Sequence, residues 1–120
     1  MSKKHIIIGT TATNRSILHN DVISEWCAYF NELDKSKYDI QWFINIDYIE
    51  ALNEDVLTTR DNLKNIIKDI KIHFINGRRN IKGNFLKACK NVSSSIENYV
   101  INNKLNMDDT IIICLEDDWK

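Results

Sequence analysis

The sequence predicts an α/β fold in which a mainly parallel four-stranded sheet lies between two layers of helices. Four short apolar runs, rich in β-branched residues, alternate with longer segments whose apolar residues recur at helical spacing. The 120 residues suffice for one domain with a hydrophobic core. Alternation of this kind is typical of parallel strands joined by right-handed crossovers, with helices on both sheet faces.

The first strand and helix are predicted near the N-terminus. The run His5–Gly9 is short and β-branched, which favours a strand, and the polar residues that follow it predict a turn. Apolar residues at helical spacing predict a helix over residues 20–34, with Asn20 or Asp21 as its N-cap. The histidines show no metal-type spacing, so we expect them at the surface or at strand edges.

The middle and the end of the chain repeat the same alternation. Asp39–Ile46 predicts a second strand, and Leu52–Lys68 an amphipathic helix capped by Asn53. A third strand is predicted at Ile70–Ile75, followed by a polar loop at Asn76–Asn80 and a long helix over Gly83–Asn102. A turn at Asn106–Asp109 then leads into a fourth strand that begins at Thr110.

The fourth strand ends in three consecutive acids. Ile111–Leu115 is wholly apolar, which predicts a strand buried on both faces. It runs directly into Glu116, Asp117 and Asp118, whose carboxylates repel one another unless a cation or polar ligand compensates them. Because ligands bind at the carboxyl ends of strands in open α/β sheets, we expect a ligand here.

The strand order decides what faces these acids. A Rossmann-like order of 3-2-1-4 makes strands 1 and 4 neighbours and opens a crevice where the chain reverses its direction of travel. The loop from Thr10 to Arg15 then lies beside Glu116–Asp118, with room for a ligand between them.

Glu116 and Asp118 are candidate metal ligands. Alternate side chains of an extended backbone point the same way, so both carboxylates can contact one cation. Oxygen ligands suit Mg²⁺ or Mn²⁺, and a nucleotide diphosphate supplies further oxygens. The alternative is an acidic turn that is simply solvated.

Further candidate contacts follow the first three strands. Thr10, Thr11 and Arg15 are suited to a base or a phosphate, and Arg79 to a phosphate. Asp47 ends the second strand, where an acid often bonds a ribose or a base. For Thr10, Thr11 and Arg15, the alternative is a hydroxyl-rich segment that leads into a helix. For Arg79 it is a solvated basic loop, and for Asp47 it is a turn or N-cap aspartate.

Two motifs resemble the nucleotide-sugar-binding half of a GT-A fold glycosyltransferase. Leu115–Trp119 resembles the DxD element of that superfamily in its EDD form. Arg79 and Asn80, followed by Gly83, resemble the RN-x-G stretch of family-2-like members, with one extra residue before the glycine. Thr10, Thr11 and Asp47 fall where the superfamily contacts the nucleotide.

The resemblance implies a role for each candidate residue. Glu116 and Asp118 would hold Mn²⁺ or Mg²⁺, and Asp117 would lie near the ribose or the donor sugar. The residues implied to contact the rest of the nucleotide sugar are Thr10, Thr11 and Arg15 for the nucleoside, Asp47 for the base or ribose, and Arg79 and Asn80 for the diphosphate or sugar.

The function implied by the resemblance is a metal-dependent glycosyltransferase that uses a nucleotide-diphosphate sugar, most simply a UDP-sugar. The second half of such an enzyme supplies the acceptor site, so residues 1–120 are expected to form one donor-binding domain, either the N-terminal part of a larger enzyme or a module that works in an oligomer. The alternative is a non-catalytic α/β nucleotide-binding or protein-interaction domain.

The charge and the apolar runs of the sequence indicate which partners and which location to expect. The formal net charge of −1 provides no global field to attract nucleic acid. No apolar run is long enough to span a bilayer or to form the core of a signal peptide, so a cytoplasmic protein is expected.

Overall fold

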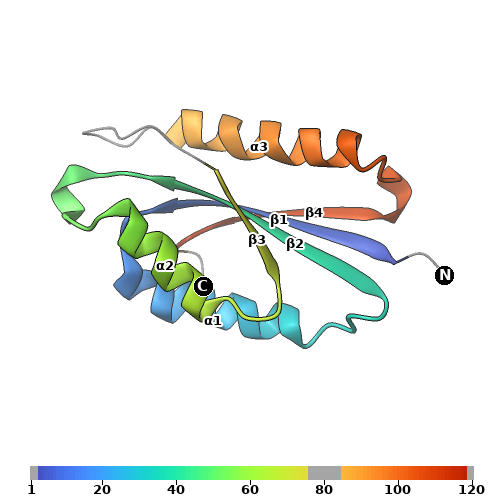
Figure 1. Ribbon diagram of the computed structural model, residues 1–120, viewed down its shortest axis with the longest axis horizontal. Coiled ribbons are helices and arrows are strands. Elements are labelled where there is room, and N and C mark those ends of the chain that lie inside the picture. The colour runs from blue at the N-terminus through green and yellow to red at the C-terminus, as the bar shows by residue number, and fades with distance from the viewer. Residues whose placement is uncertain (1–2, 76–84, 119–120) are drawn as a thin grey trace.

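The computed structural model describes residues 3–75 and 85–118. Its four strands form one sheet, with helix α3 on one face and helices α1 and α2 on the other (Figure 1). The strands are β1 (Lys4–Thr13), β2 (Tyr38–Asp47), β3 (Lys71–Ile75) and β4 (Thr110–Glu116).

The sheet has the predicted topology. Its strand order is β3-β2-β1-β4, and the β1–β2, β1–β4 and β2–β3 pairs are all parallel. The predicted α/β class, the strand order and the Rossmann-like three-layer arrangement are therefore confirmed. The carboxyl ends of β1 and β4 lie side by side, as a switch point requires.

Helices of different lengths cover the two faces. The α-helices are α1 (Ser16–Asn31), α2 (Val56–Ile66) and α3 (Phe85–Asn102), and the short 3₁₀ helices are η1 (Glu50–Leu52) and η2 (Met107–Asp109). Within residues 3–75 and 85–118, none of the helices is both long and apolar enough to cross a membrane.

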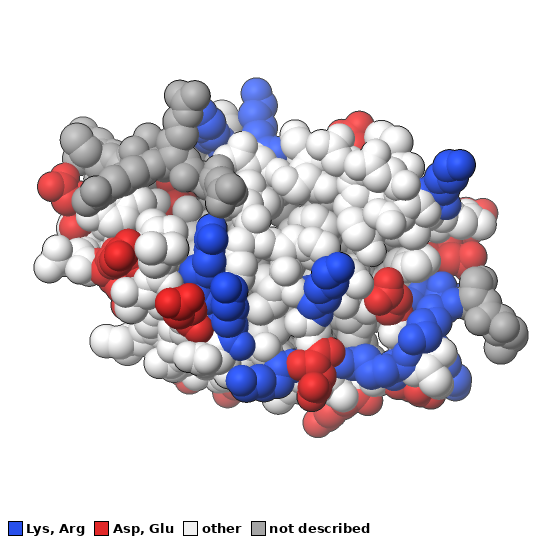
Figure 2. All heavy atoms as spheres, in the orientation of Figure 1, with Lys and Arg blue, Asp and Glu red and all other residues white. Residues whose placement is uncertain are grey.

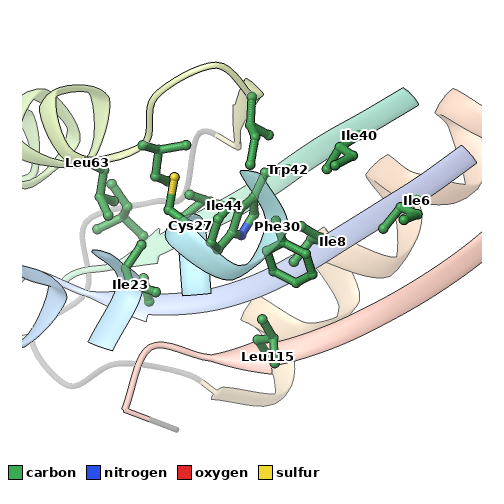
Figure 3. Close-up of a cluster of buried hydrophobic side chains, with 14 residues drawn as sticks. Ile6, Ile8, Ile23, Cys27, Phe30, Ile40, Trp42, Ile44, Leu63 and Leu115 are labelled. Atoms are coloured by element: carbon green, nitrogen blue, oxygen red, sulfur yellow. The ribbon is translucent and has the colours of Figure 1, made fainter. Parts of the chain in front are cut away.

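The described residues form two hydrophobic core clusters, one on each face of the sheet. The larger cluster joins the sheet to α1 and α2 and includes Ile8, Phe30 and Trp42, all at most 1% exposed (Figure 3). The smaller cluster lies under α3 and contains Ile7, Phe43, Val92 and Ile96. Burial of these apolar side chains is what holds the helices against the sheet.

Strand β1 is longer than the sequence predicted. The expected turn after Gly9 is wrong, because Thr10–Thr13 continue the strand and pair with β2, and Thr10 and Thr11 pair with β4 as well. Threonine is β-branched and fits a strand that has neighbours on both sides.

Helix α1 begins earlier than predicted. It starts at Ser16, so neither Asn20 nor Asp21 is its N-cap. The carboxylate of Glu54, 38 residues away in the chain, accepts hydrogen bonds from the Ser16 backbone N–H and hydroxyl at 3.1 and 2.7 Å. A cap supplied from such a distance leaves no local signal in the sequence.

The helix predicted over Leu52–Lys68 is divided into η1 and α2. Asn53 is not the cap of the longer helix, since it ends η1 in the left-handed region at φ 57°. The N-cap of α2 is Asp55, whose carboxylate accepts a hydrogen bond from the Leu57 backbone N–H at 3.2 Å.

The prediction that β4 is buried on both faces is wrong. Ile111 and Ile112 are 49% and 43% exposed, because β4 is an edge strand that the helices only partly cover. The predicted loop at Asn76–Asn80 and the predicted helix start at Gly83 lie outside the described residues.

Candidate functional site

The carboxyl ends of β2, β1 and β4 bring several of the predicted residues to one edge of the sheet. In the strand register, Thr13 is paired with Asp47 on one side, and Thr11 is paired with Glu116 on the other. The backbone N–H of Asp117 also donates a hydrogen bond to the Thr11 carbonyl at 3.3 Å. The predicted juxtaposition of the acidic end of β4 with the end of β1 is confirmed.

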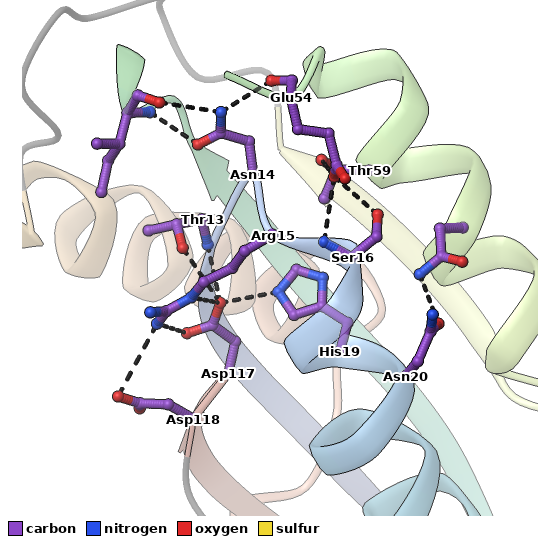
Figure 4. A network of polar contacts seen from close by, with 12 residues as sticks. Thr13, Asn14, Arg15, Ser16, His19, Asn20, Glu54, Thr59, Asp117 and Asp118 are labelled. Carbon is purple, nitrogen blue, oxygen red and sulfur yellow. Dashed lines mark hydrogen bonds and ion pairs between the residues drawn. The ribbon is translucent and has the colours of Figure 1, made fainter. Parts of the chain in front are cut away.

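Asp117 is anchored by the segment that follows β1. Its Oδ1 lies 2.7 Å from Nη2 of Arg15, and its Oδ2 lies 3.0 Å from Arg15 Nε (Figure 4). The same Oδ2 accepts hydrogen bonds from the Thr13 backbone N–H at 3.0 Å and from the Thr13 hydroxyl at 3.4 Å. A two-point guanidinium–carboxylate pair fixes geometry as well as charge.

His19 is a third partner of Asp117, and sequence reasoning missed it. The imidazole is fully buried on α1, and its Nε2 lies 2.8 Å from Asp117 Oδ2. Its Nδ1 is buried and has no hydrogen-bond partner among the described residues. The expectation that the histidines lie at the surface or at strand edges is wrong for His19. A signal was present, because His19 precedes the buried Val22 and Ile23 by three and four positions.

The partners of Asp117 determine its charge. Burial alone would raise the pKa of this carboxyl, but hydrogen bonds from His19, Arg15 and the Thr13 backbone N–H outweigh burial and hold the pKa well below its usual value. The hydrogen bond to Asp117 in turn raises the pKa of Arg15. Asp117 is therefore an ionised, internally compensated group at neutral pH.

A second polar network fixes the start of α1 against the segment before α2. Asn14, which is fully buried, donates hydrogen bonds to the carbonyls of Ile49 and Glu54 at 3.0 and 2.8 Å. It also accepts one from the Ile49 backbone N–H at 2.8 Å. The carboxylate of Glu54 accepts hydrogen bonds from Ser16 and from the Thr59 hydroxyl. Hydrogen bonds from Thr59 and Ser16 outweigh the effect of burial and lower the pKa of Glu54.

Glu116 and Asp118 flank the anchored Asp117. Strand β4 ends at Glu116, and the next two residues form a turn, so the premise of one extended backbone over these acids does not hold. The Asp118 side chain is 47% exposed, and its Oδ2 lies 3.8 Å from Arg15 Nη2. Glu116 is half-buried and contributes to the wall of a pocket.

That pocket has a volume of about 220 Å³ and lies between α3 and the ends of β1 and β4. Its polar lining includes Thr11, Ser93 and Glu116, and the remainder of its wall is mostly apolar. Gly9 also lines it, and a Cβ at this position would lie 2.7 Å from Val92 Cγ1, so the glycine is what allows α3 to approach β1 so closely.

The two predicted threonines face opposite sides of the sheet. Thr11 lines the pocket under α3, whereas Thr10 is 1% exposed and its hydroxyl accepts a hydrogen bond from Trp42 Nε1 at 2.8 Å. Asp47 is half-buried at the end of β2. Arg79 and Asn80 lie outside the described residues.

Glu116 and Asp118 remain the candidate metal ligands. Across the described part of the chain, no three histidine, cysteine or acidic side chains form a group that could hold a metal ion. Glu116 and Asp118 provide two carboxylates, which is the number that Mg²⁺ commonly takes from a protein when phosphates and waters complete its shell.

No protein-family model, curated protein sequence or solved structure matches this chain.

Proposed function

We propose that this chain is the donor-binding part of a metal-dependent glycosyltransferase of the GT-A type. It binds a nucleotide-diphosphate sugar, with UDP-sugars as the first class to test, for transfer to an acceptor that the present residues do not identify. The ligand occupies the edge of the sheet where Asp47, Thr11, Glu116 and Asp118 lie at the ends of three adjacent strands.

One observation supports this proposal more than the others, namely the anchoring of Asp117 by Arg15, His19 and Thr13. The charge of the middle acid is compensated inside the protein, and the turn that carries its two neighbours is fixed. Glu116 and Asp118 are then held at the switch point, and among the described residues Asp118 has only a longer contact with Arg15, at 3.8 Å. We therefore assign Asp117 and Arg15 to positioning, and the candidate ligand contacts to the residues on either side.

The two carboxylates on either side of Asp117 suit Mn²⁺ or Mg²⁺ in donor type when a diphosphate contributes further oxygens. Glu116 and Asp118 would hold the ion, and neither imidazole nor thiolate ligands are needed for such a hard cation. When bound, the ion would stabilise negative charge on the diphosphate as it leaves. Thr11 supports the nucleotide contact better than Thr10, whose hydroxyl is already used by Trp42.

Titration calorimetry with UDP tests the proposal. Affinity should fall by more than about tenfold, or 1.4 kcal/mol, when Mn²⁺ is replaced by a chelator. The double variant Glu116→Ala/Asp118→Ala should lose this metal dependence. Because one of these residues is half-buried and the other exposed, the double variant is expected to fold, which circular dichroism would check.

The matched control is Asp108→Ala/Asp109→Ala, which removes two acids at the opposite end of β4. This control changes the net charge by the same amount as the test variant and should bind UDP with unchanged metal dependence. Equal, metal-independent binding of UDP by all three proteins would reject the metal site.

The second candidate is a non-catalytic α/β domain that binds a nucleotide or another protein. The exposure of Ile111 and Ile112 on an edge strand favours an interaction role. This candidate predicts UDP binding that is independent of Mn²⁺, or no UDP binding.

A further inference from the structure

The segment that joins β1 to α1 contacts two separate parts of the chain. Within this β1–α1 segment (residues 13–16), Thr13 and Arg15 contact the Asp117 carboxylate at the acidic end of β4 (Figure 4). Its other two residues, Asn14 and Ser16, contact the residues between β2 and α2 instead. Four consecutive residues therefore hold two regions that are distant from each other in the sequence.

The β1–α1 segment is fixed by its own hydrogen bonds and by burial. The Arg15 backbone N–H donates to the Thr13 carbonyl at 2.9 Å, and the Arg15 carbonyl accepts from two backbone N–H groups in the first turn of α1 at 3.2 and 3.3 Å. Asn14 is fully buried, and so is His19, which contacts Asp117 one turn into α1. Because closely packed groups move together, a displacement on one side of this segment is passed to the other.

The β2–α2 segment (residues 48–55) has little burial of its own. None of its residues is fully buried, and all three residues of η1 are exposed. Asn14 accepts a hydrogen bond from the Ile49 backbone N–H at 2.8 Å and donates one to the Ile49 carbonyl at 3.0 Å. Ser16 donates two hydrogen bonds to the Glu54 carboxylate. Segments with few buried apolar contacts open at low free-energy cost, so these hydrogen bonds control how readily this one opens.

Both regions that the β1–α1 segment holds are acidic. Residues 47–55 contain no lysine or arginine and four acids, namely Asp47, Glu50, Glu54 and Asp55. Acidic side chains lie at the end of the molecule where η1 lies, whereas lysine and arginine lie along α2 and beside β3 (Figure 2). Strands β2 and β4 flank β1, so their ends lie about two strand spacings, or about 10 Å, apart. The screening length is about 8 Å at physiological ionic strength, so the two acidic regions still repel each other in part. Arg15, the only charged residue of the β1–α1 segment, lies between them.

We infer that the β1–α1 segment is a two-sided clamp, which couples the acidic end of β4 to the β2–α2 segment. When Asp117 no longer holds Arg15 and His19, the β2–α2 segment opens more readily, and loosening the β2–α2 side in turn loosens the Arg15–Asp117 pair. The two sides of the candidate site therefore become ordered together. One consequence rests on the proposed function: a ligand that restrains the acidic end of β4 also closes the β2–α2 segment, which directly follows Asp47.

Hydrogen exchange of the Ile49 amide, which donates to Asn14, tests the coupling in one direction. Asp117→Asn should accelerate this exchange at least about tenfold more than the control Val92→Ala, which lowers overall stability from the cluster under α3. Arg15→Lys keeps the charge but loses the two-point contact, so it should show a smaller excess and serves if Asp117→Asn does not fold. Equal acceleration at Ile49 in all three variants would overturn the inference.

Proton exchange of the Arg15 Nε–H, followed by NMR, tests the coupling in the other direction. This group donates to Asp117 Oδ2 at 3.0 Å, and Asn14→Ala should accelerate its exchange by about threefold or more, because coupling between two sites is reciprocal. The matched control is Asn20→Ala, which removes an exposed hydrogen bond from Asn62 that also joins α1 to α2. Exchange at Arg15 that is the same in wild type and Asn14→Ala would show that the two sides are independent.

The consequence for ligand binding is tested with UDP and Mg²⁺, with calorimetry to establish whether they bind. On binding, exchange of the Ile49 amide should slow by about threefold or more in wild type but not in Asn14→Ala. Binding that leaves Ile49 exchange unchanged in wild type would overturn the inference. If UDP and Mg²⁺ do not bind, the proposed function fails instead, and the comparisons at Ile49 and Arg15 without ligand still decide whether the clamp exists.

Discussion

Arg15 and Asp117, 102 residues apart in the chain, form a two-point ion pair with contacts of 2.7 and 3.0 Å. The pair joins the segment after β1 to the turn after β4 at the point where the sheet changes its direction of travel. The aspartate side chain is 4% exposed and the arginine side chain 34%. The acidic end of β4 is therefore part of the folded framework and not a loose tail.

Arg15→Ala should destabilise the protein. Removing one partner of a buried pair leaves an uncompensated charge, which costs about 3–5 kcal/mol when the pair is fully buried. Because a third of Arg15 is exposed to solvent and His19 still contacts Asp117, we expect about 2 kcal/mol. Urea unfolding measures this loss, with Lys90→Ala, an exposed cation on α3, as the control. If Arg15→Ala lost less unfolding free energy than Lys90→Ala, the ion pair would not contribute to the stability of the fold.

The lowered pKa of Asp117 predicts a pH dependence of stability. Its ordinary value is 3.8, so the stabilisation is fully present above that pH and is lost as the pH falls toward the lower pKa of the folded state. Wild type should exceed Asp117→Asn in unfolding free energy by about 2–3 kcal/mol at pH 7, and the difference should shrink below about pH 4.

Chemical denaturation of both proteins between pH 2.5 and 7 measures that difference. Asp108→Asn, an exposed acid before β4, should differ from wild type by a small and nearly constant amount. If the difference in unfolding free energy between wild type and Asp117→Asn grew as the pH fell, the assigned effect of the lowered pKa would be wrong.

Gly9→Ala should force α3 away from the sheet. The added Cβ would lie 2.7 Å from Val92 Cγ1 and 2.9 Å from Ile96 Cδ1, closer than a real Cβ tolerates. The contacts are with side-chain atoms, so the cost should be about 1–3 kcal/mol and not a loss of folding. Adding Val92→Ala should recover part of the loss in a double-mutant cycle. If the stability losses of Gly9→Ala and Val92→Ala simply added in the double variant, the close contact between Gly9 and Val92 would not be the cause of the loss.

Asn14→Ala should loosen the segment between β2 and α2. The variant removes three hydrogen bonds to Ile49 and Glu54 from a fully buried position, at a cost of about 2–3 kcal/mol. Amide hydrogen exchange at Ile49 should accelerate well beyond the change at β3, which does not contact Asn14 through these bonds. Asn14→Asp keeps only the acceptor for the Ile49 N–H and should give an intermediate result. Unchanged exchange at Ile49 in both variants would contradict the assigned contacts.

The order of elements along the chain could be predicted because it depends on apolar patterns that are local in sequence. The strand order 3-2-1-4 was assumed from the rule for doubly wound sheets, and the structure has that order. The boundaries that were wrong depend on distant partners. Thr10–Thr13 form strand because β2 pairs with all four residues and β4 with the first two. Helix α1 starts at Ser16 because Glu54 reaches its first turn. Periodicity does not contain such information.

The candidate site was predictable to a similar degree. The acidic end of β4 and its neighbour β1 follow from topology, whereas the partners of Asp117 follow from side-chain packing. A buried His19 directed at Asp117 requires α1 to lie on a particular face in a particular rotation. The apolar run of β4 was misread because a wholly apolar run also occurs on an edge strand that the helices only partly cover.

The most direct test of the account is paramagnetic line broadening of amide NMR signals by Mn²⁺ in the presence of UDP. We predict selective broadening at Thr11–Thr13 and Glu116–Asp118, its loss in Glu116→Ala/Asp118→Ala, and its retention in Asp108→Ala/Asp109→Ala. Broadening centred elsewhere, or unchanged broadening in the Glu116→Ala/Asp118→Ala protein, would contradict a metal–diphosphate site at the end of β4.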